Sequence, residues 1–301
     1  MKNSITVQIS EGLGNQLFMY AHAYSFSKLL DYTLLIDSKS GFFKKKNRLR
    51  GQRFLLDRFN VDLKNAPSHK IPDTFAKNNL NKLLIIFDFF KTKKSFLIEK
   101  FYKELNYNKD NFSNDIYIRG NFENENFFYP YRNDLVNLFS VKPKYLKNNS
   151  NIISKLKNSN SVSIHVRQNR FSDQNLKKNY LRNIKQSNLF LNNNLQYIDR
   201  SIEYLNSKFS DLNFFISSND FIDLKKHFSK YKNNKFYYLE NNDELNDFAL
   251  FKYAKHFIVG PSTFHWWGAW LNNNTDKVCL CPKNINPSNN KNFWPPNWLK
   301  I

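Results

Sequence analysis

The stretch from Ser10 to Lys28 constrains the fold most strongly, because within it the pattern changes from that of a strand to that of a helix. The residues before it alternate between polar and apolar, the period of a strand with one buried face: Ile5, Val7 and Ile9. Gly12 and Gly14 follow, and two glycines permit a tight turn and the left-handed backbone that other residues resist. The sequence therefore predicts a strand, a glycine turn and a helix.

The helix is predicted from apolar residues that recur at helical spacing after the turn: Leu17, Phe18, Ala21, Ala23, Tyr24 and Leu29. A second strand, predicted over Thr33–Asp37, completes a strand–helix–strand unit. Units of this kind build parallel sheets, so we expect an α/β fold.

The glycine turn has a chemical consequence, because it places backbone N–H groups and the positive end of a helix dipole at one spot. That spot suits an anion or a sugar hydroxyl, with Asn15 in the first helical turn. A dinucleotide-binding loop, G-x-G-x-x-G, needs a third glycine where this chain has Leu17, so the motif favours NAD only weakly. An ordinary strand-to-helix turn stays open as the alternative.

The composition excludes a disordered chain, since 41% of the 301 residues are hydrophobic and 17% are aromatic. The longest apolar run, Leu83–Phe90, is interrupted by Asp88, so we expect no membrane-spanning segment, and the N-terminus lacks the apolar core of a signal peptide. Cys279 and Cys281 lie two residues apart on a predicted strand, which suits neither a disulfide nor a zinc site. We therefore expect reduced cysteines in a cytoplasmic protein.

The formal net charge of +21 raises the question of an acidic partner. The densest basic run is Phe42–Arg53, and Lys91–Lys94 is a second one. No recognition helix, zinc finger or aromatic RNA-binding pattern accompanies these runs, so a nucleic acid is not the expected partner. Attraction to an anionic membrane surface or to a phosphorylated substrate is expected instead.

The alternation of strands and helices predicts two Rossmann-like domains that face one cleft. The first comprises residues 1–155 and carries a variable basic insertion at 41–114. The second comprises residues 156–301, and a stretch at 141–160 that is rich in Lys, Asn and Ser marks the boundary between them.

The second domain is predicted to begin with a strand at Val162–Arg167, whose polar face would point into a cleft or into solvent. A polar loop or lid is predicted over Gln168–Asn194, and a helix over Leu195–Phe209. His165 and Arg167 share the polar face of the strand, and a guanidinium matches phosphate oxygens, so the pair suggests a diphosphate site. A surface cation on an edge strand is the alternative.

Three residues near the C-terminal end could complete such a site. Ser262 and Thr263 follow a predicted strand and open a helix, where hydroxyl groups either cap the helix or help to hold a phosphate. Asp247 lies on a mostly apolar helix, where a carboxylate needs a donor: the N–H edge of a purine, or a nearby Arg or Lys. No Asp-x-Asp motif and no metal-ligand spacing occur in the sequence, so no metal is expected.

Taken together, these segments resemble the α-1,2-fucosyltransferases of glycosyltransferase family 11. The matching segments occur in the order found in that family and extend from residue 5 to about residue 298: Gly12–Ala21, Arg119–Glu123, His165–Arg167, Phe214–Asp220, Asp247 and Gly260–Trp270. The region 41–114 matches poorly, as expected if it shapes the acceptor site.

The resemblance implies a metal-independent, inverting transferase of GT-B type that needs no cofactor. Its donor would be GDP-β-L-fucose, and fucose would become α-linked to a sugar hydroxyl, usually O2 of galactose. By position, Arg167 would be the catalytic residue and hold the β-phosphate. Further donor-binding residues are implied around the phosphates, Gly14, Asn15, Ser262 and Thr263, and around guanosine, His165 and Asp247.

This chain also departs from the family pattern. Members typically continue His-x-Arg with Arg-Gly-Asp-Tyr, whereas here the sequence continues Gln168-Asn169-Arg170-Phe171. Glu11 stands where glycine is usual. Asp173 or Glu11 could therefore replace the missing carboxylate as the general base.

The leading hypothesis is an α-1,2-fucosyltransferase of bacterial surface glycans, acting on an oligosaccharide or lipid-linked glycan. We expect it in the cytoplasm, with peripheral contact to an anionic inner membrane. One alternative keeps the fold and changes the nucleotide-sugar donor or the linkage. The other is a catalytically silent protein that binds a glycan or a nucleic acid.

Overall fold

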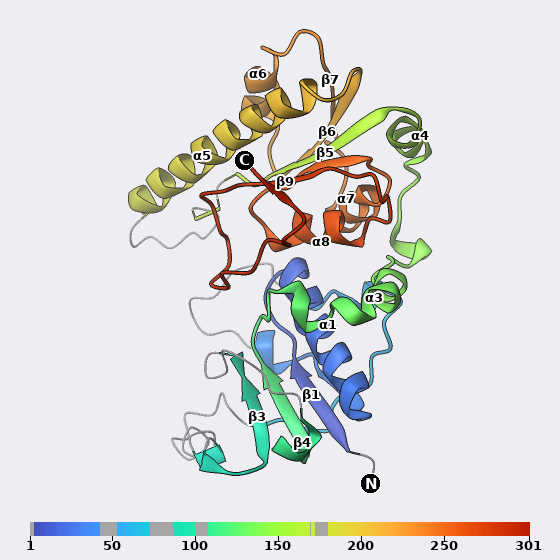
Figure 1. The fold of residues 1–301 in the computed structure, drawn as a ribbon, viewed down its shortest axis with the longest axis vertical. Helices are drawn as coiled ribbons and strands as arrows, with labels where there is room; N and C mark the ends of the chain where they lie inside the picture. The colour runs from blue at the N-terminus through green and yellow to red at the C-terminus, as the bar shows by residue number, and fades with distance from the viewer. Residues whose placement is uncertain are drawn as a thin grey trace. The chain divides into compact units, whose positions relative to one another are not determined.

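The computed structural model describes residues 3–42, 53–72, 87–88, 90–99, 108–168, 170–171 and 180–301. The chain divides into two compact units, Met1–Phe139 and Ser140–Ile301, and each contains a parallel sheet (Figure 1). Most of the basic run Phe42–Arg53 and of the predicted insertion 41–114 lies outside the described residues.

The first unit contains the strand–helix–strand unit that the sequence predicts, as β1 (Ser4–Gln8), α1 (Leu13–Leu30) and β2 (Thr33–Asp37). Two further strands, β3 (Lys94–Ile98) and β4 (Phe112–Arg119), complete a sheet with the order β2-β1-β4-β3 and parallel pairing throughout. The strand order reverses between β1 and β4, and ligands bind α/β sheets at the carboxyl ends of strands where this happens. A short helix, α3 (Arg132–Leu138), closes the unit.

The turn between β1 and α1 differs from the prediction, because the left-handed residue in it is not a glycine. Glu11 has φ 66°, whereas Gly12 is extended at φ −77° and Gly14 lies within α1. The side chain of Gln16 supports this turn: its Nε2 donates to the carbonyl oxygens of Glu11 and Arg53, both at 2.8 Å. An amide side chain thus holds a strained conformation at a residue that is not a glycine.

Helix α1 is buried on most of its faces instead of along a single stripe. Leu29, which the sequence placed in the apolar stripe, is 55% exposed and is therefore outside the core. A polar residue of the same helix is in the core: His22 is fully buried, and its ring stacks on that of Phe122 with centroids 3.7 Å apart. Neither nitrogen of His22 has a hydrogen-bond partner in the part of the chain that the structure describes.

We expect His22→Phe to raise the free energy of unfolding by about 1–3 kcal/mol, because it removes two buried polar atoms without partners and retains a ring on Phe122. Burial lowers the pKa of His22 to about 3, so between that pH and about 6.5 only the unfolded chain is protonated here. Stability should therefore fall on acidification, with a smaller slope in the variant. Urea denaturation at pH 5 and 7 measures both effects, with His69→Gln at an exposed histidine as the control.

The second unit contains a six-stranded sheet with the order β10-β9-β8-β5-β6-β7, again parallel throughout. Its strands are β5 (Asn160–Val166), β6 (Leu212–Ser218), β7 (Lys235–Tyr238), β8 (His256–Ile258), β9 (Cys279–Cys281) and β10 (Leu299–Lys300). Its helices are α4 (Ser150–Asn158), α5 (Tyr180–Asn206), α6 (Ile222–Phe228), α7 (Glu244–Phe251) and α8 (Thr263–Leu271). The order reverses between β5 and β8, so these two strands define the expected ligand-binding edge.

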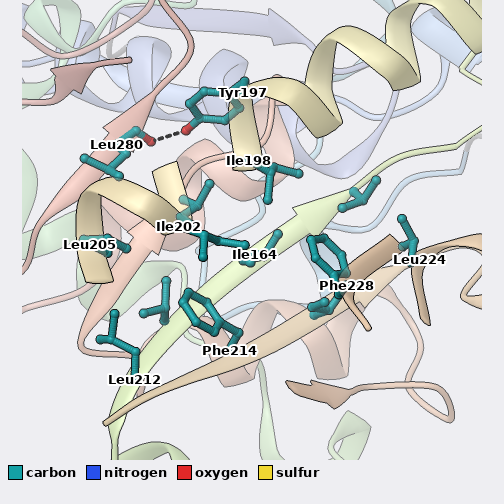
Figure 2. Close-up of a cluster of buried hydrophobic side chains, with 14 residues drawn as sticks. Ile164, Tyr197, Ile198, Ile202, Leu205, Leu212, Phe214, Leu224, Phe228 and Leu280 are labelled. Atoms are coloured by element: carbon teal, nitrogen blue, oxygen red, sulfur yellow. Dashed lines mark hydrogen bonds between the residues drawn. The ribbon is translucent and has the colours of Figure 1, made fainter. Parts of the chain in front are cut away.

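Strand β5 is buried on both faces over most of its length, and its polar face opens only at the carboxyl end, where His165 is half-buried and the following Arg167 is exposed. On the apolar face, Val162, Ile164 and Val166 pack in the core formed with α5 and neighbouring strands (Figure 2). Tyr197 of α5 is buried in this core, and its hydroxyl donates to the carbonyl oxygen of Leu280 at 2.7 Å. On the other face Ser163 is buried as well, as is usual for strands inside a parallel sheet.

Helix α5 begins well before the predicted helix at Leu195–Phe209 and replaces the second half of the predicted loop Gln168–Asn194. The many Asn and Lys residues of this stretch hid the helix. Its apolar side chains meet the core of the second unit at helical spacing: Leu191, Leu195, Ile198, Ile202 and Leu205.

The division after Phe139 also differs from the boundary that the sequence placed near residue 155. The intervening residues bond to the second unit: the backbone N–H of Lys147 donates to Asn246 Oδ1 and its Nζ to the carbonyl oxygen of Asn241, both at 2.7 Å. Helix α4 then leads directly into β5. Short 3₁₀ turns occur at Ser40–Phe42, Leu56–Arg58, Ser68–Lys70, Lys109–Asn111, Glu125–Phe127, Tyr129–Tyr131 and Pro143–Tyr145.

Both cysteines lie on β9, where they are buried and free. Among the described residues, no helix has the length and apolar character that crossing a bilayer requires.

Candidate functional site

Four of the predicted site residues meet at the carboxyl edge of the second sheet. His165 lies at the end of β5, and Arg167 follows that strand directly with an exposed side chain. Ser262 and Thr263 follow the neighbouring strand β8 and begin α8. Because β5 pairs with both β6 and β8, it is an interior strand, and the alternative of a cation on an edge strand is wrong.

The turn after β8 approaches β5 closely at Gly260. A Cβ atom at this position would lie 2.2 Å from the carbonyl oxygen of His165. His265 holds the turn there, because its Nδ1 accepts from the backbone N–H of Gly260 at 3.1 Å and its Nε2 lies 3.0 Å from Ser163 Oγ. Burial, and then the neighbouring His165, lower the pKa of His265 well below its ordinary value. It is therefore a neutral imidazole that carries its proton on Nε2 and donates to Ser163.

Sequence reasoning missed these two positioning residues, Gly260 and His265. The only sequence feature that could have indicated them is their position, with a glycine before and a histidine after the predicted pair of hydroxyl residues.

His165 is also neutral, and its ring contacts residues of β6, α7 and α8. Its Nδ1 lies 2.9 Å from the Oγ of Ser217, its register partner on β6. Its ring lies 5.2 Å from that of Phe264 on α8 and 6.4 Å from that of Phe251 on α7, measured between centroids. Burial, with a smaller effect of the Arg167 charge, lowers the pKa of His165 to about 4. Near neutral pH it can donate or accept a hydrogen bond without carrying charge.

The start of α8 has the features of an anion-binding helix end. The Ser262 hydroxyl accepts from the backbone N–H of His265 at 3.2 Å and thus caps the helix. The first turn contains no acidic side chain, so the positive end of the helix dipole is not offset within that turn. Together with the exposed guanidinium of Arg167, this end of the sheet can attract and orient a phosphate.

Asp247 is a buried carboxylate on α7, only 8% exposed. Asn242 bonds to this carboxyl group, and Oδ1 has no hydrogen-bond partner among the described residues. Burial raises the pKa of Asp247 to about 7. Phe251, whose ring lies near that of His165, is one turn further along the same helix. A ligand that donates hydrogen bonds would satisfy the unpartnered oxygen.

The other predicted residues belong to the first unit or lie outside the described residues. Asn15 Nδ2 donates to Glu11 Oε2, and Gly14 is buried in the first turn of α1, at the carboxyl end of β1. Asp173 lies outside the described residues. Within the described ranges, no group of three or more His, Cys, Asp or Glu residues is arranged to hold a metal ion.

Comparison with known sequences gives the same family over nearly the whole chain. The sequence model described as Glycosyl transferase family 11 matches residues 4–301. The O-antigen biosynthesis glycosyltransferase WbnK of Escherichia coli is 27% identical over 97% of this chain and 99% of its own length. An alpha-1,2-colitosyltransferase, also of Escherichia coli, is 29% identical over 92% of this chain and 91% of its own length.

Solved structures share the fold at low sequence identity. A mutant of FUT1 from Arabidopsis thaliana in complex with GDP is 11% identical and superposes with a TM-score of 0.55, covering 96% of this chain and 71% of that one. The alpha-1,6-fucosyltransferase NodZ soaked with GDP-fucose is also 11% identical, with a TM-score of 0.50 over 90% of this chain and 93% of that one. The predicted α/β fold class, two Rossmann-like units of GT-B type, is confirmed.

Proposed function

Because this chain belongs to glycosyl transferase family 11, we propose that it is an inverting, metal-independent α-1,2-fucosyltransferase that moves L-fucose from GDP-β-L-fucose to a galactoside hydroxyl. That it is a glycosyltransferase follows from the family. The donor, the linkage and the role of each residue are the proposal. The relative WbnK acts in O-antigen biosynthesis, which supports a bacterial surface glycan as the acceptor.

One observation supports GDP as the donor: the second unit contains both a sheet edge suited to phosphate and a buried carboxylate that can accept hydrogen bonds. Arg167 and the N-terminus of α8 would hold the β-phosphate, with Ser262 and Thr263 beside it. The unpartnered Oδ1 of Asp247 would accept from the N–H edge of guanine. His165, which is neutral and points its Nδ1 at Ser217, would contact the guanosine portion.

Transfer breaks the bond between C1 of fucose and the β-phosphate oxygen, and GDP leaves with the bonding electrons. The transition state resembles an oxocarbenium ion, and negative charge grows on the β-phosphate as it departs. A guanidinium and a helix N-terminus at that phosphate stabilise the growing charge without a metal ion. Arg167 is therefore the residue that we propose to be catalytic.

The acceptor hydroxyl must lose a proton during the same reaction. Glu11 and Asp173 stay the two candidate bases, and Glu11 is the one within the described residues. Its carboxylate accepts a hydrogen bond from Asn15, which lies with Gly14 in the first turn of α1. The resemblance assigns Gly14 and Asn15 to donor binding, and this role stays a prediction.

A second candidate donor is favoured by the colitosyltransferase that is 29% identical to this chain. Colitose is the 3-deoxy counterpart of fucose, so the two donors share every group that Arg167 and Asp247 would contact. A site that bonds to the 3-hydroxyl of fucose rejects the deoxy sugar strongly, whereas a site without that bond accepts both. The family favours an enzyme over the silent binding protein considered from the sequence.

The deciding experiment measures transfer and donor hydrolysis with GDP-fucose, GDP-colitose, GDP-mannose and UDP-galactose. Turnover of GDP-fucose to an α-1,2-linked product supports the proposal, and preferred turnover of GDP-colitose supports the second candidate. Turnover of UDP-galactose alone contradicts GDP recognition by Asp247.

We expect GDP affinity to fall as the pH drops below about 7, because protonation of Asp247 removes the charged acceptor for guanine N–H groups. Asp247→Asn should weaken GDP binding about 10- to 100-fold at pH 8, the loss typical of a hydrogen bond to a charged group. Calorimetry with the wild type and the variant between pH 6 and 8 tests this, since titration of the GDP phosphate is common to both. Asp276→Asn, at an exposed carboxylate of the same unit, is the control; equal pH dependence in all three proteins would contradict the assignment.

We also propose peripheral contact with an anionic membrane, where a lipid-linked acceptor would lie. The support is the net charge of +21. The densest basic run, Phe42–Arg53, falls mostly outside the described residues, so the contact surface is not assigned to particular side chains.

A further inference from the structure

Arg170 lies just after β5 and contacts two other elements of the second unit. Its Nη1 donates to the carbonyl oxygen of Pro261 at 2.7 Å, in the turn that opens α8. Its guanidinium carbon lies 4.9 Å from the ring centroid of Phe190 on α5 and 5.9 Å from that of Phe171. The side chain therefore connects helix α5 to the turn before α8.

Gln168 and Phe171, which lie on either side of Arg170 in the sequence, are hydrogen-bonded to other elements. The backbone N–H of Gln168 donates to Asn219 Oδ1 and its Nε2 to the carbonyl oxygen of Asp220, both at 2.8 Å, in the loop after β6. On the other side, the backbone N–H of Phe171 donates to Ser187 Oγ of α5 at 2.9 Å. Gln168 is buried, whereas the preceding residue, Arg167, is exposed.

Arg170 brings positive charge to the N-terminal end of α8. A guanidinium beside the turn before α8 adds positive charge at the helix end that is already positive, and no acidic residue in the first turn offsets it. A phosphate at this end would reverse the sign of that interaction.

We propose that Arg170 is a positioning residue for the transfer reaction, which holds the turn at Pro261 so that the N-terminus of α8 and Arg167 act on the same diphosphate. This inference rests on the proposed function. A guanidinium suits the task because its carbon lies over the Phe190 ring while its Nη1 donates to the carbonyl oxygen of Pro261. A lysine would keep the charge but could not make both contacts.

The test compares Arg170→Lys, Phe190→Leu and the double variant in a transfer assay with GDP-fucose and in GDP calorimetry. Each single variant should weaken GDP binding about tenfold, and the double variant should be no weaker than the worse single one, because both remove the same support. The KM for the donor should rise and kcat should fall, while the KM for the acceptor stays unchanged. Arg182→Gln, at an exposed arginine of α5, controls for the loss of positive charge.

Each of the other outcomes would overturn the inference for a different reason. Wild-type activity and GDP affinity in Arg170→Lys would show that the positive charge at this position is sufficient and that the planar guanidinium is not needed. Additive losses in the double variant would show that Phe190 does not hold it. Lower kcat with an unchanged donor KM and GDP affinity would show a loss of folded enzyme only. If the wild-type protein itself binds no GDP, the proposed function and this inference both fail, whereas wild-type binding with unaffected variants overturns this inference alone.

Discussion

Arg167→Lys should lower kcat/KM for donor and acceptor about 100- to 1,000-fold, while the melting temperature stays unchanged. The loss follows from geometry, because lysine keeps the positive charge but lacks the planar pair of donors that matches phosphate oxygens. The stability should not change, since Arg167 is exposed beyond the end of β5. Steady-state kinetics with GDP-fucose and a thermal melt of the same preparation measure both quantities.

The matched control is Arg200→Lys, at an exposed arginine on α5 of the same unit. It makes the same chemical change at a position that we place outside the site, so its kinetics should equal those of the wild type. If Arg167→Lys also transfers fucose at the wild-type rate, Arg167 does not hold the leaving group, and the proposed mechanism is wrong.

Gly260→Ala should abolish most GDP binding and lower the free energy of unfolding by about 1–3 kcal/mol, the usual cost of overpacking a buried position. The added Cβ would lie 2.2 Å from the carbonyl oxygen of His165, and a backbone atom of an interior strand cannot yield as a side chain can. The turn must then move away from β5. This movement would break the hydrogen bond from the Gly260 N–H to His265 and displace the start of α8.

Gly12→Ala serves as the stability control in the other unit. Nothing lies within 4 Å of a Cβ atom at Gly12, and its φ of −77° is allowed for alanine. Its free energy of unfolding should therefore change by less than about 0.5 kcal/mol. Urea denaturation and GDP calorimetry compare the two variants; equal GDP affinity of Gly260→Ala and the wild type would refute the role that we give to this turn.

Local patterns were enough to predict the main elements of both sheets. The period-two alternation before Gly12 and the run over Thr33–Asp37 became β1 and β2, and the alternation around Ile164 became β5. These signals are reliable because they report on burial of neighbouring side chains along one element. Helix α5 was only half recognised, since its Asn- and Lys-rich surface masks the apolar spacing that meets the core.

Other errors arose where a conformation is supported by residues distant in sequence. The sequence predicts glycine in the left-handed turn, yet Glu11 adopts it, and Gln16, which bonds to the Glu11 carbonyl oxygen, also bonds to Arg53, 37 positions later. The boundary near residue 155 missed that Lys147 bonds to residues of the second unit almost a hundred positions later. Neither contact leaves a local pattern in the sequence.

By itself, the sequence determined the fold class, the parallel sheets and the chemical types that the site offers: a guanidinium, an imidazole, two hydroxyl groups and a buried carboxylate. These follow from short-range periodicity and from residue chemistry. Only the tertiary structure decided that β5 and β8 are neighbours, which brings His165 and Arg167 beside the start of α8, and that Gly260 and His265 hold that turn in place. Strand order is set by the packing of whole elements against each other, and no single stretch of sequence encodes it.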